Sequence, residues 1–372
     1  MLGPEGPSPA QRWVAGGRLA AARDAADLAA SIPGVGRVVL AAPAKDYAEV
    51  CRDWGVTCDF DAPEAPFRFG ERLAQLLVRY PAQAHLYLGA GSLPLLPVEE
   101  LAQAVEEVRL AAQPLAITNN LHSSDWIALN CAAAIVARPD RLANDNALGW
   151  VLRTEAGVEV RSLPPSAGTR LDIDTPADLL LLGLHARLRP ELRRFLTEQP
   201  KPSAAWVAAG RRLFARAGHV ALLGRVSSAV WAHVEANTQA WVRVFSEERG
   251  MTASGRLAAG QVKSLVGAHL NRLGPATFFD ELGNLVEAAF FDTRVVLAHA
   301  QRWPSSADRY ASDLGWPDQI EDPWLRQLTE AAVNARIPVV MGGHGVVTGD
   351  LYGLVEIARD GGLAGGPGRQ NA

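Results

Sequence analysis

Along this 372-residue chain, segments with the apolar pattern of strands alternate with segments that have the amphipathic pattern of helices, and one such series occurs in each half. In the first half, β-branched apolar runs at residues 36–43 and 56–61 predict strands, and the amphipathic stretch 69–81 predicts a helix. The run "HLYL" from His85 leads into a glycine turn, followed by a predicted helix at 98–111 and a strand at 114–118. Short connections between alternating strands and helices are typical of a parallel α/β sheet.

The second half repeats this alternation from His219 onward. Strands are predicted for "HVALLG", "AWVRVF", "DTRVVLAHA" (292–300) and "IPVVMGGHG". Helices are predicted after a Ser227 or Ser228 cap, over 257–273 and 275–290, over 322–336, and over 350–359. We therefore predict an α/β protein with a Rossmann-like, mostly parallel domain at 1–185, a helical connector at 186–218, a second α/β domain at 219–360 and a flexible tail at 361–372.

Composition narrows the class of protein. A hydrophobic content of 48% with 20% charged residues fits an ordinary globular protein, and the length favours two domains. The net charge of −4 predicts no nucleic-acid partner and no attraction to an anionic membrane, and no long apolar run or signal peptide is present. The three cysteines, Cys51, Cys58 and Cys131, lack metal-ligand spacing, so we expect reduced thiols and a cytoplasmic protein. The sequence leaves open whether the chain forms a homo-oligomer.

The segment "RLDIDTPADLL" (170–180) carries the most specific local signal. Asp172 and Asp174 alternate on an extended piece and so point to opposite faces. Thr175 is suited to cap the helix that follows, Pro176 fits its first position, and Asp178 falls three residues after the cap. Such a cap would also hold Asp174 rigidly, as a hard oxygen ligand for Mg²⁺ requires.

"DIDTPADL", together with "AGGR" (15–18), "IPGVGRVVLAAP" (32–43) and "LPLL" (93–96), resembles the nucleotidyltransferases with a glycosyltransferase-A-like fold. This group includes molybdenum-cofactor guanylyltransferase, 2-phospho-lactate guanylyltransferase and the cytidylyltransferases, and the resemblance covers residues 12–185. It implies transfer of a nucleoside monophosphate from an NTP to a small phosphorylated or hydroxyl acceptor, with Mg²⁺ as the cofactor. It also implies Asp174 as the metal-binding acid, with Asp172 beside it.

Two features depart from the pattern of that family. The glycine loop that would surround the triphosphate is reduced to Gly16, Gly17 and Arg18, after a poor strand. Where the family has a second metal-binding aspartate before "LPLL", this chain has Gly91 and Ser92. Gly89 and Gly91 leave room for a ligand, and Ser92 can still donate a hydrogen bond to a phosphate.

Polar clusters accompany the predicted sheet. Amides can recognise base edges, ribose or sugar hydroxyls, although turns and caps use the same residues. Asp125, three residues after His122, is a candidate replacement for the missing acid. The amide and acid candidates for ligand binding are Asn119, Asn120, Asn144, Asp145 and Asn146.

In the second half, polar side chains follow the predicted strands, which is where α/β sheets bind ligands. "GGHG" could receive an anion at the start of a helix. No zinc-type spacing, P-loop or nucleophile elbow accompanies these residues. The candidates are Arg225, Glu247, Glu248, Arg249, His299, Asp308, Arg309 and His344.

Three hypotheses follow from the sequence. The first is a Mg²⁺-dependent nucleotidyltransferase that binds a nucleotide and a small phosphorylated or sugar-like ligand in its amino-terminal half. The second is a catalytically degenerate descendant that binds a nucleotide or sugar as a sensor, or that serves as a scaffold. The third is an enzyme whose active site lies in the carboxyl-terminal α/β domain.

Overall fold

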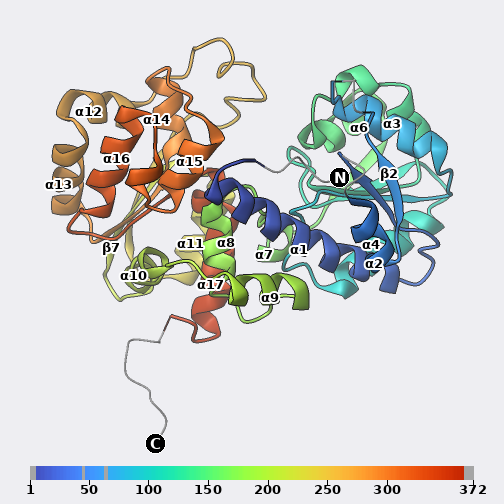
Figure 1. The fold of residues 1–372 in the computed structure, drawn as a ribbon, viewed down its shortest axis with the longest axis horizontal. Coiled ribbons are helices and arrows are strands. Elements are labelled where there is room, and N and C mark those ends of the chain that lie inside the picture. Colours follow the sequence, from blue (N-terminus) through green and yellow to red (C-terminus); the bar gives the residue numbers. More distant parts are fainter. Residues whose placement is uncertain (1–5, 44–46, 63–65, 364–372) are drawn as a thin grey trace, which may run out of the picture. The chain divides into compact units, whose positions relative to one another are not determined.

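The computed structural model describes residues 6–43, 47–62 and 66–363 (Figure 1). Strands and helices alternate in it as an α/β architecture, which confirms the fold class expected from the sequence. The tail expected at 361–372 lies almost wholly outside the described residues. Within those residues, no helix combines the length and apolar character needed to cross a membrane.

The chain divides into two compact units. The first unit consists mainly of Ala15–Asp172, with Arg189–Leu192. The second consists of Ile173–Leu188 and the chain from Arg193 onward, with a short amino-terminal stretch ending at Val14. The helix that follows "DIDTPADL" therefore lies in the second unit, whereas the sequence placed it at the end of the first.

The first unit holds two separate sheets. A four-stranded sheet has the order β3-β5-β4-β6, in which β5 runs antiparallel to both of its neighbours and β4 pairs with β6 in parallel. A smaller parallel sheet pairs β1 with β2. The strands are β1 (Val39–Ala42), β2 (Thr57–Phe60), β3 (His85–Leu88), β4 (Leu115–Thr118), β5 (Trp126–Leu129) and β6 (Glu159–Ser162).

Helices cover both faces of the four-stranded sheet. Leu101 and Val108 of α4 pack with Leu28 of α1 against one face, and Phe69 and Leu73 of α3 pack against the other. Burial on both faces explains why strands such as β5 are apolar throughout. The helices are α1 (Pro9–Ser31, which begins in the second unit), α2 (Ala48–Trp54), α3 (Phe69–Arg79), α4 (Val98–Leu110), α5 (Ala132–Val136), α6 (Leu148–Thr154) and α7 (Ala167–Arg170), with 3-10 turns η2 (Pro139–Arg141) and η3 (Asp145–Ala147).

The second unit contains one parallel sheet with the order β10-β9-β7-β8. Ala221 and Phe291 face a core formed with α12, α13, α14 and α16, and Phe290 faces Trp206 of α10 on the other side. The strands are β7 (His219–Gly224), β8 (Trp241–Ser246), β9 (Ala288–Asp292) and β10 (Val339–Gly342). The helices are α8 (Pro176–Leu182), α9 (Pro190–Glu198, which begins in the first unit), α10 (Ala204–Leu213), α11 (Ser228–Asn237), α12 (Leu265–Leu273), α13 (Pro275–Leu285), α14 (Thr293–His299), α15 (Ser306–Asp313), α16 (Pro323–Val333) and α17 (Gly349–Arg359), with η4 (Pro317–Gln319) and η5 (His344–Val347).

The third strand of this sheet does not lie where the sequence predicted it. Residues 292–300 were expected to be a strand, but Thr293–His299 form α14, and the strand is the preceding Ala288–Asp292. Asp292 ends the strand and caps the helix, because its carboxylate accepts the backbone N–H of Arg294. The helix predicted from 257 likewise begins only at Leu265, where Ser264 caps it.

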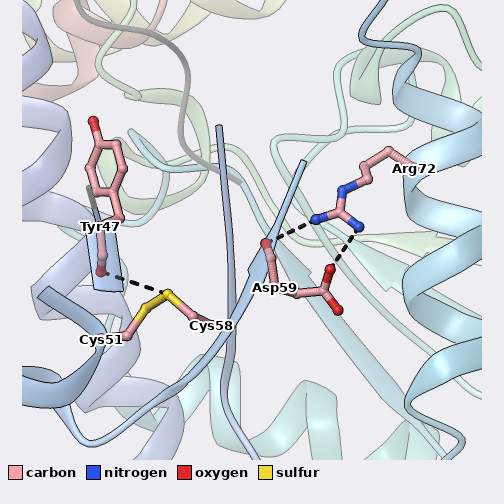
Figure 2. The surroundings of a disulfide bond; sticks show 5 residues. All are labelled: Tyr47, Cys51, Cys58, Asp59 and Arg72. Carbon is pink, nitrogen blue, oxygen red and sulfur yellow. Dashed lines mark hydrogen bonds and ion pairs between the residues drawn. A yellow bond between two sulfur atoms is a disulfide. The ribbon is translucent and has the colours of Figure 1, made fainter. Parts of the chain in front are cut away.

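The cysteine prediction is wrong for one pair. Figure 2 shows a disulfide between Cys51 of α2 and Cys58 of β2, whose Cα atoms lie 5.8 Å apart. The left-handed turn at Gly55 (φ 66°) folds the end of α2 back toward β2 and so brings the two cysteines together. Cys131 is a free thiol, and burial raises its pKa to about 11.

Candidate functional site

The end of β3 makes a tight turn that is fixed by its own hydrogen bonds. The N–H of Gly89 donates to the carbonyl of Asp125 at 2.9 Å, which continues the β3–β5 ladder by one residue. The Ser92 hydroxyl donates to the carbonyl of Gly89 at 2.7 Å, and the N–H of Ser92 donates to the same oxygen at 3.1 Å. The turn therefore holds Gly89 and Ser92 close together at the strand end.

Backbone strain marks the next residue. Leu93 has a φ of 66°, in the left-handed region that bulky side chains disfavour. Its side chain is 3% exposed and packs in the same apolar cluster as Leu96 and Leu101. Conformations of this kind cost about 1–3 kcal/mol and persist where packing enforces them, most often at ligand sites.

Two carboxylates border this turn. The Tyr87 hydroxyl donates to Asp145 Oδ2 at 2.9 Å, and Asn119 Nδ2 donates to Asp125 Oδ2 at 2.6 Å. A Cβ atom at Gly89 would lie 3.7 Å from Asp145 Oδ2 and 3.1 Å from the Asp125 carbonyl oxygen. A side chain at position 89 would therefore press on the backbone of Asp125 and contact the carboxylate of Asp145.

The electrostatics of the turn favour a cation. Burial raises the pKa of Tyr87 well above its usual value, and the charge and hydrogen bond of Asp145 and the charge of Asp125 add to the rise. Tyr87 therefore stays neutral and serves as a hydrogen-bond donor. The negative charges of Asp125 and Asp145 thus both act on the Tyr87 phenol.

The surrounding polar residues orient these acids. Asn119 is buried and also donates to the carbonyl of Thr169, while its own carbonyl accepts from the Arg170 guanidinium. At the rim, the Ser123 hydroxyl donates to Asn146 Oδ1. The Asn120 side chain accepts the N–H of His122, and Asn144 is exposed before η3. The predicted residues Gly89, Ser92, Asn119, Asp125 and Asp145 thus meet at one strand end.

Sequence reasoning missed Tyr87, Leu93 and Arg170 at this site. Tyr87 sits inside an apolar strand, and nothing in that pattern indicates a hydrogen bond from its hydroxyl to an acid. The positive φ of Leu93 has no sequence signal, because a glycine would be expected there. Arg170 precedes the "DIDTPADL" motif, which drew the attention to its aspartates instead.

The "AGGR" segment does not form a phosphate-binding loop. Gly16, Gly17 and Arg18 lie in the interior of α1, which begins at Pro9. Their backbone N–H groups are more than four residues from the helix start, so the helix uses them in its own hydrogen bonds. The family resemblance fails at this segment.

The predicted cap of α8 is confirmed, but the two aspartates before it fall in different units. Asp178 Oδ2 accepts the N–H and hydroxyl of Thr175 and the N–H of Asp174. Asp174 is exposed and lies in the second unit, whereas Asp172 ends the main segment of the first. Across the described ranges, no group of three or more His, Cys, Asp or Glu side chains is arranged to hold a metal ion.

A second polar cluster lies at the carboxyl ends of β7, β9 and β10. The strand order reverses between β7 and β9, which is the position where open α/β sheets bind ligands. Arg225 makes a bidentate ion pair with the buried Asp292, at 2.6 and 3.0 Å. His344 Nε2 donates to the carbonyl of Arg225 at 3.2 Å.

His344 and Asp292 differ in how their pKa values respond to this site. Desolvation of the His344 ring among surrounding protein atoms, followed by the charge of Arg225, lowers the pKa of His344. For Asp292, burial alone would raise the pKa, but Arg225 outweighs it and lowers the pKa. A neutral imidazole beside a buried ion pair results.

The other candidates of the second unit hold loops and helix ends. Glu247 accepts the Ser264 hydroxyl and the N–H of Leu265 at the start of α12, and His299 Nδ1 accepts the N–H of Ser264. The remaining residues contribute as follows: Glu248 pairs with Arg256, the Arg249 carbonyl accepts from Arg256, Asp308 accepts the N–H groups of Glu321 and Asp322, and Arg309 lies over the Trp303 ring.

A pair of buried acids lies next to the "GGHG" turn. Asp178 and Asp350 are each 1% exposed, and both border Gly345. Apart from each other, Asp178 Oδ1 and the two carboxylate oxygens of Asp350 have no hydrogen-bond partner among the described residues. Burial, followed by the charge of Asp174, raises the pKa of Asp178 to about 7, and burial and Asp178 raise the pKa of Asp350 well above its usual value. The two groups therefore share a proton near neutral pH.

Comparison with known proteins adds little to this geometry. No protein-family model matches the chain, and no curated protein matches it at a significant level. Among solved structures, CMP-2-keto-3-deoxy-manno-octonic acid synthetase complexed with CTP matches 38% of this chain and 77% of its own, at 11% identity and a TM-score of 0.30. A likeness at this TM-score and identity assigns neither the fold nor an activity.

Proposed function

We propose that the first unit is a nucleotidyltransferase-like module that binds a nucleotide together with Mg²⁺ at the end of β3. The observation that carries the proposal is the meeting of Asp125, Asp145 and Asn119 around Tyr87 and Gly89. Mg²⁺ in nucleotide sites is commonly held by one or two carboxylates and the phosphates of the substrate. The Asp145 carboxylate beside Gly89, and the Asp125 carboxylate whose charge also acts on Tyr87, are the two acids that we propose for this role.

In this proposal Asp125 and Asp145 hold the metal, in the role that the family resemblance gives to Asp174. Tyr87 and Asn119 position the two carboxylates through the hydrogen bonds already described. A bound Mg²⁺ would neutralise phosphate charge. The absence of a third ligand among the described residues is consistent with weak metal binding until a nucleotide supplies its phosphates.

The reaction we propose is the transfer of a nucleoside monophosphate to a small phosphorylated or hydroxyl acceptor. An acceptor oxygen forms a bond to the α-phosphorus, the bond from that phosphorus to the bridging oxygen breaks, and pyrophosphate leaves with the electron pair. A hydroxyl acceptor gives its proton to water. The protein contributes positioning: the Ser92 hydroxyl holds the turn closed through its bond to Gly89, and Asn120, Asn144 and Asn146 at the rim contact base, ribose or acceptor hydroxyls.

Pyrophosphate release tests the reaction directly. The full-length chain is incubated with each NTP and Mg²⁺ and a panel of phosphorylated acids and sugars, and compared with Asp125→Asn, Asp145→Asn and the exposed control Asp140→Asn. We expect release in the wild type and in the control, and a fall of at least about 100-fold in the two site variants. Binding of nucleotide without any release would favour the sensor hypothesis instead.

The carboxyl-terminal sheet supports a second candidate function, because Arg225, Asp292 and His344 meet where the strand order reverses. We infer a ligand site there, separate from the nucleotide site of the first unit. His344→Ala should abolish the binding of its ligand in a thermal-shift panel of phosphorylated acids and leave nucleotide binding unchanged. Loss of both, or of neither, would contradict a second site.

A further inference from the structure

A cavity of about 700 Å³ lies in the first unit, and residues of both β1 and β3 line it. Val39 and Ala41 of β1 border it, as do all four residues of β3, His85–Leu88. Leu77 of α3 and Val105 of α4 also border it, so the lining is mostly apolar. These two strands belong to different sheets, and each stands at the edge of its own sheet.

The backbone of β1 turns one edge toward β2 and the other toward the cavity. The carbonyls of Val38 and Ala42 accept N–H groups of Thr57 and Asp61, the residues on either side of β2 in the chain. Because successive residues of a strand direct their backbone groups to opposite sides, the N–H and C=O of Val39 and Ala41 point away from β2. Val39 and Ala41 line the cavity, and Leu40 and Ala42 do not.

The backbone of β3 is arranged in the same way. The N–H of Gly89 donates to Asp125, so odd-numbered residues of β3 make the hydrogen bonds to β5. The N–H and C=O of Leu86 therefore point away from β5, and β5 is the only strand paired with β3 in the described sheets. Two strands that line the cavity, from two different sheets, thus each have a row of backbone groups not directed to their sheet neighbours.

We propose that this cavity is an acceptor site for an extended apolar peptide strand, which would pair with β1 and β3 and continue the two existing ladders into one sheet. A small apolar molecule could fill the volume, but it would leave both backbone rows without partners. A strand of four or five residues matches the lengths of β1 and β3 and supplies N–H and C=O groups to both sides.

The charged side chains that line the cavity indicate which peptide sequences would bind best. The titratable side chains of the described lining are Arg37, Arg109, His85 and two tyrosines, with no acidic residue among them. Arg109 pairs with Glu106, whereas Arg37 has only the Tyr80 ring beside it among the interactions described. The preferred occupant is therefore an apolar strand with an acidic residue at the end that lies near Arg37.

The test is a fusion that presents such a strand to the intact chain. The segment Val-Leu-Val-Leu-Val-Asp is attached to the amino terminus through a flexible Gly/Ser linker, which raises its effective concentration to the millimolar range. The matched control replaces alternate residues of the segment with proline, which removes the N–H donors while keeping the attachment. Circular dichroism verifies that both fusions fold.

Amide hydrogen exchange at Val39, Ala41 and Leu86 is the readout. We expect exchange about tenfold slower or more at these three amides in the apolar fusion, and no slowing in the proline control. Arg37→Glu in the apolar fusion should reverse part of the slowing. The proposal would be overturned if these amides were equally protected in both fusions or were protected in neither. It would also be overturned if the dye ANS protected them to the same extent in the chain without a fused peptide.

Discussion

The buried acid pair of the second unit makes stability depend on pH in an unusual direction. The pKa of Asp178 rises from 3.8 to about 7 on folding, and Asp350 rises further in the same direction. Between pH 3.8 and about pH 7, Asp178 keeps its proton in the folded protein but has released it in the unfolded chain. Stability is therefore greatest below about pH 4 for this pair and is lost as the pH rises through 7.

The size of this effect follows from the shift. About three pKa units at 1.36 kcal/mol each give a contribution of about 4 kcal/mol from Asp178, lost between about pH 4 and pH 7. Asp350→Asn removes one of the two charges and offers an amide N–H to Asp178 Oδ1, which has no partner other than Asp350 among the described residues. We expect the variant to be about 1–3 kcal/mol more stable than the wild type at pH 8, with a flatter pH dependence.

Urea denaturation at pH 5, 6, 7 and 8 measures this directly for the wild type, Asp350→Asn and Asp318→Asn. Asp318 is exposed on η4 in the same unit, so its variant changes the net charge equally without touching the pair. The control should follow the wild type at every pH. If Asp350→Asn loses stability with rising pH as steeply as the wild type does, the two acids do not share a proton and the reasoning fails.

Three further changes test other parts of the structure. Arg294→Met removes the guanidinium that donates to the buried Asp313 carboxylate at 2.6 and 2.7 Å, and should lower the free energy of unfolding by about 3–5 kcal/mol in urea denaturation. A loss under about 1 kcal/mol would show that water reaches the pair. Cys51→Ser opens the bond to Cys58 and should cost about 2–3 kcal/mol, an effect that reductant reproduces in the wild type and that is absent if the thiols are already free. Tyr87→Phe removes the donor to a carboxylate and should cost about 1–3 kcal/mol by thermal unfolding, with weaker nucleotide binding; unchanged binding would contradict its positioning role.

Local sequence patterns predicted most elements because helices cover the two four-stranded sheets. The buried strands β7 and β10 and the capped helix α8 follow from apolar runs and from the Thr175–Asp178 spacing. The pattern failed at β9, where "AAFFD" continues directly into "TRVVLAH". A buried strand and a buried helix are both apolar, so periodicity cannot separate them, and the boundary is set by the cap at Asp292.

The candidate site was only partly visible for a related reason. Asp125 and Asp145 stand out as polar residues in the sequence, but nothing there indicates that both approach Tyr87 across 38 and 58 residues of chain. That approach depends on the antiparallel strand β5, which returns Asp125 to the end of β3. The direction of β5, which runs antiparallel to β3 and β4, is set by tertiary structure. Short apolar runs in the sequence do not reveal strand direction.

The most direct test of the proposed function is calorimetric titration of the full-length chain with each NTP, in the presence and absence of Mg²⁺. The account predicts saturable binding of at least one nucleotide that requires Mg²⁺, weakens about tenfold or more in both Asp125→Asn and Asp145→Asn, and is unchanged in Asp140→Asn. Nucleotide binding that is indifferent to Mg²⁺ and to both aspartates, or no binding of any NTP, would contradict it.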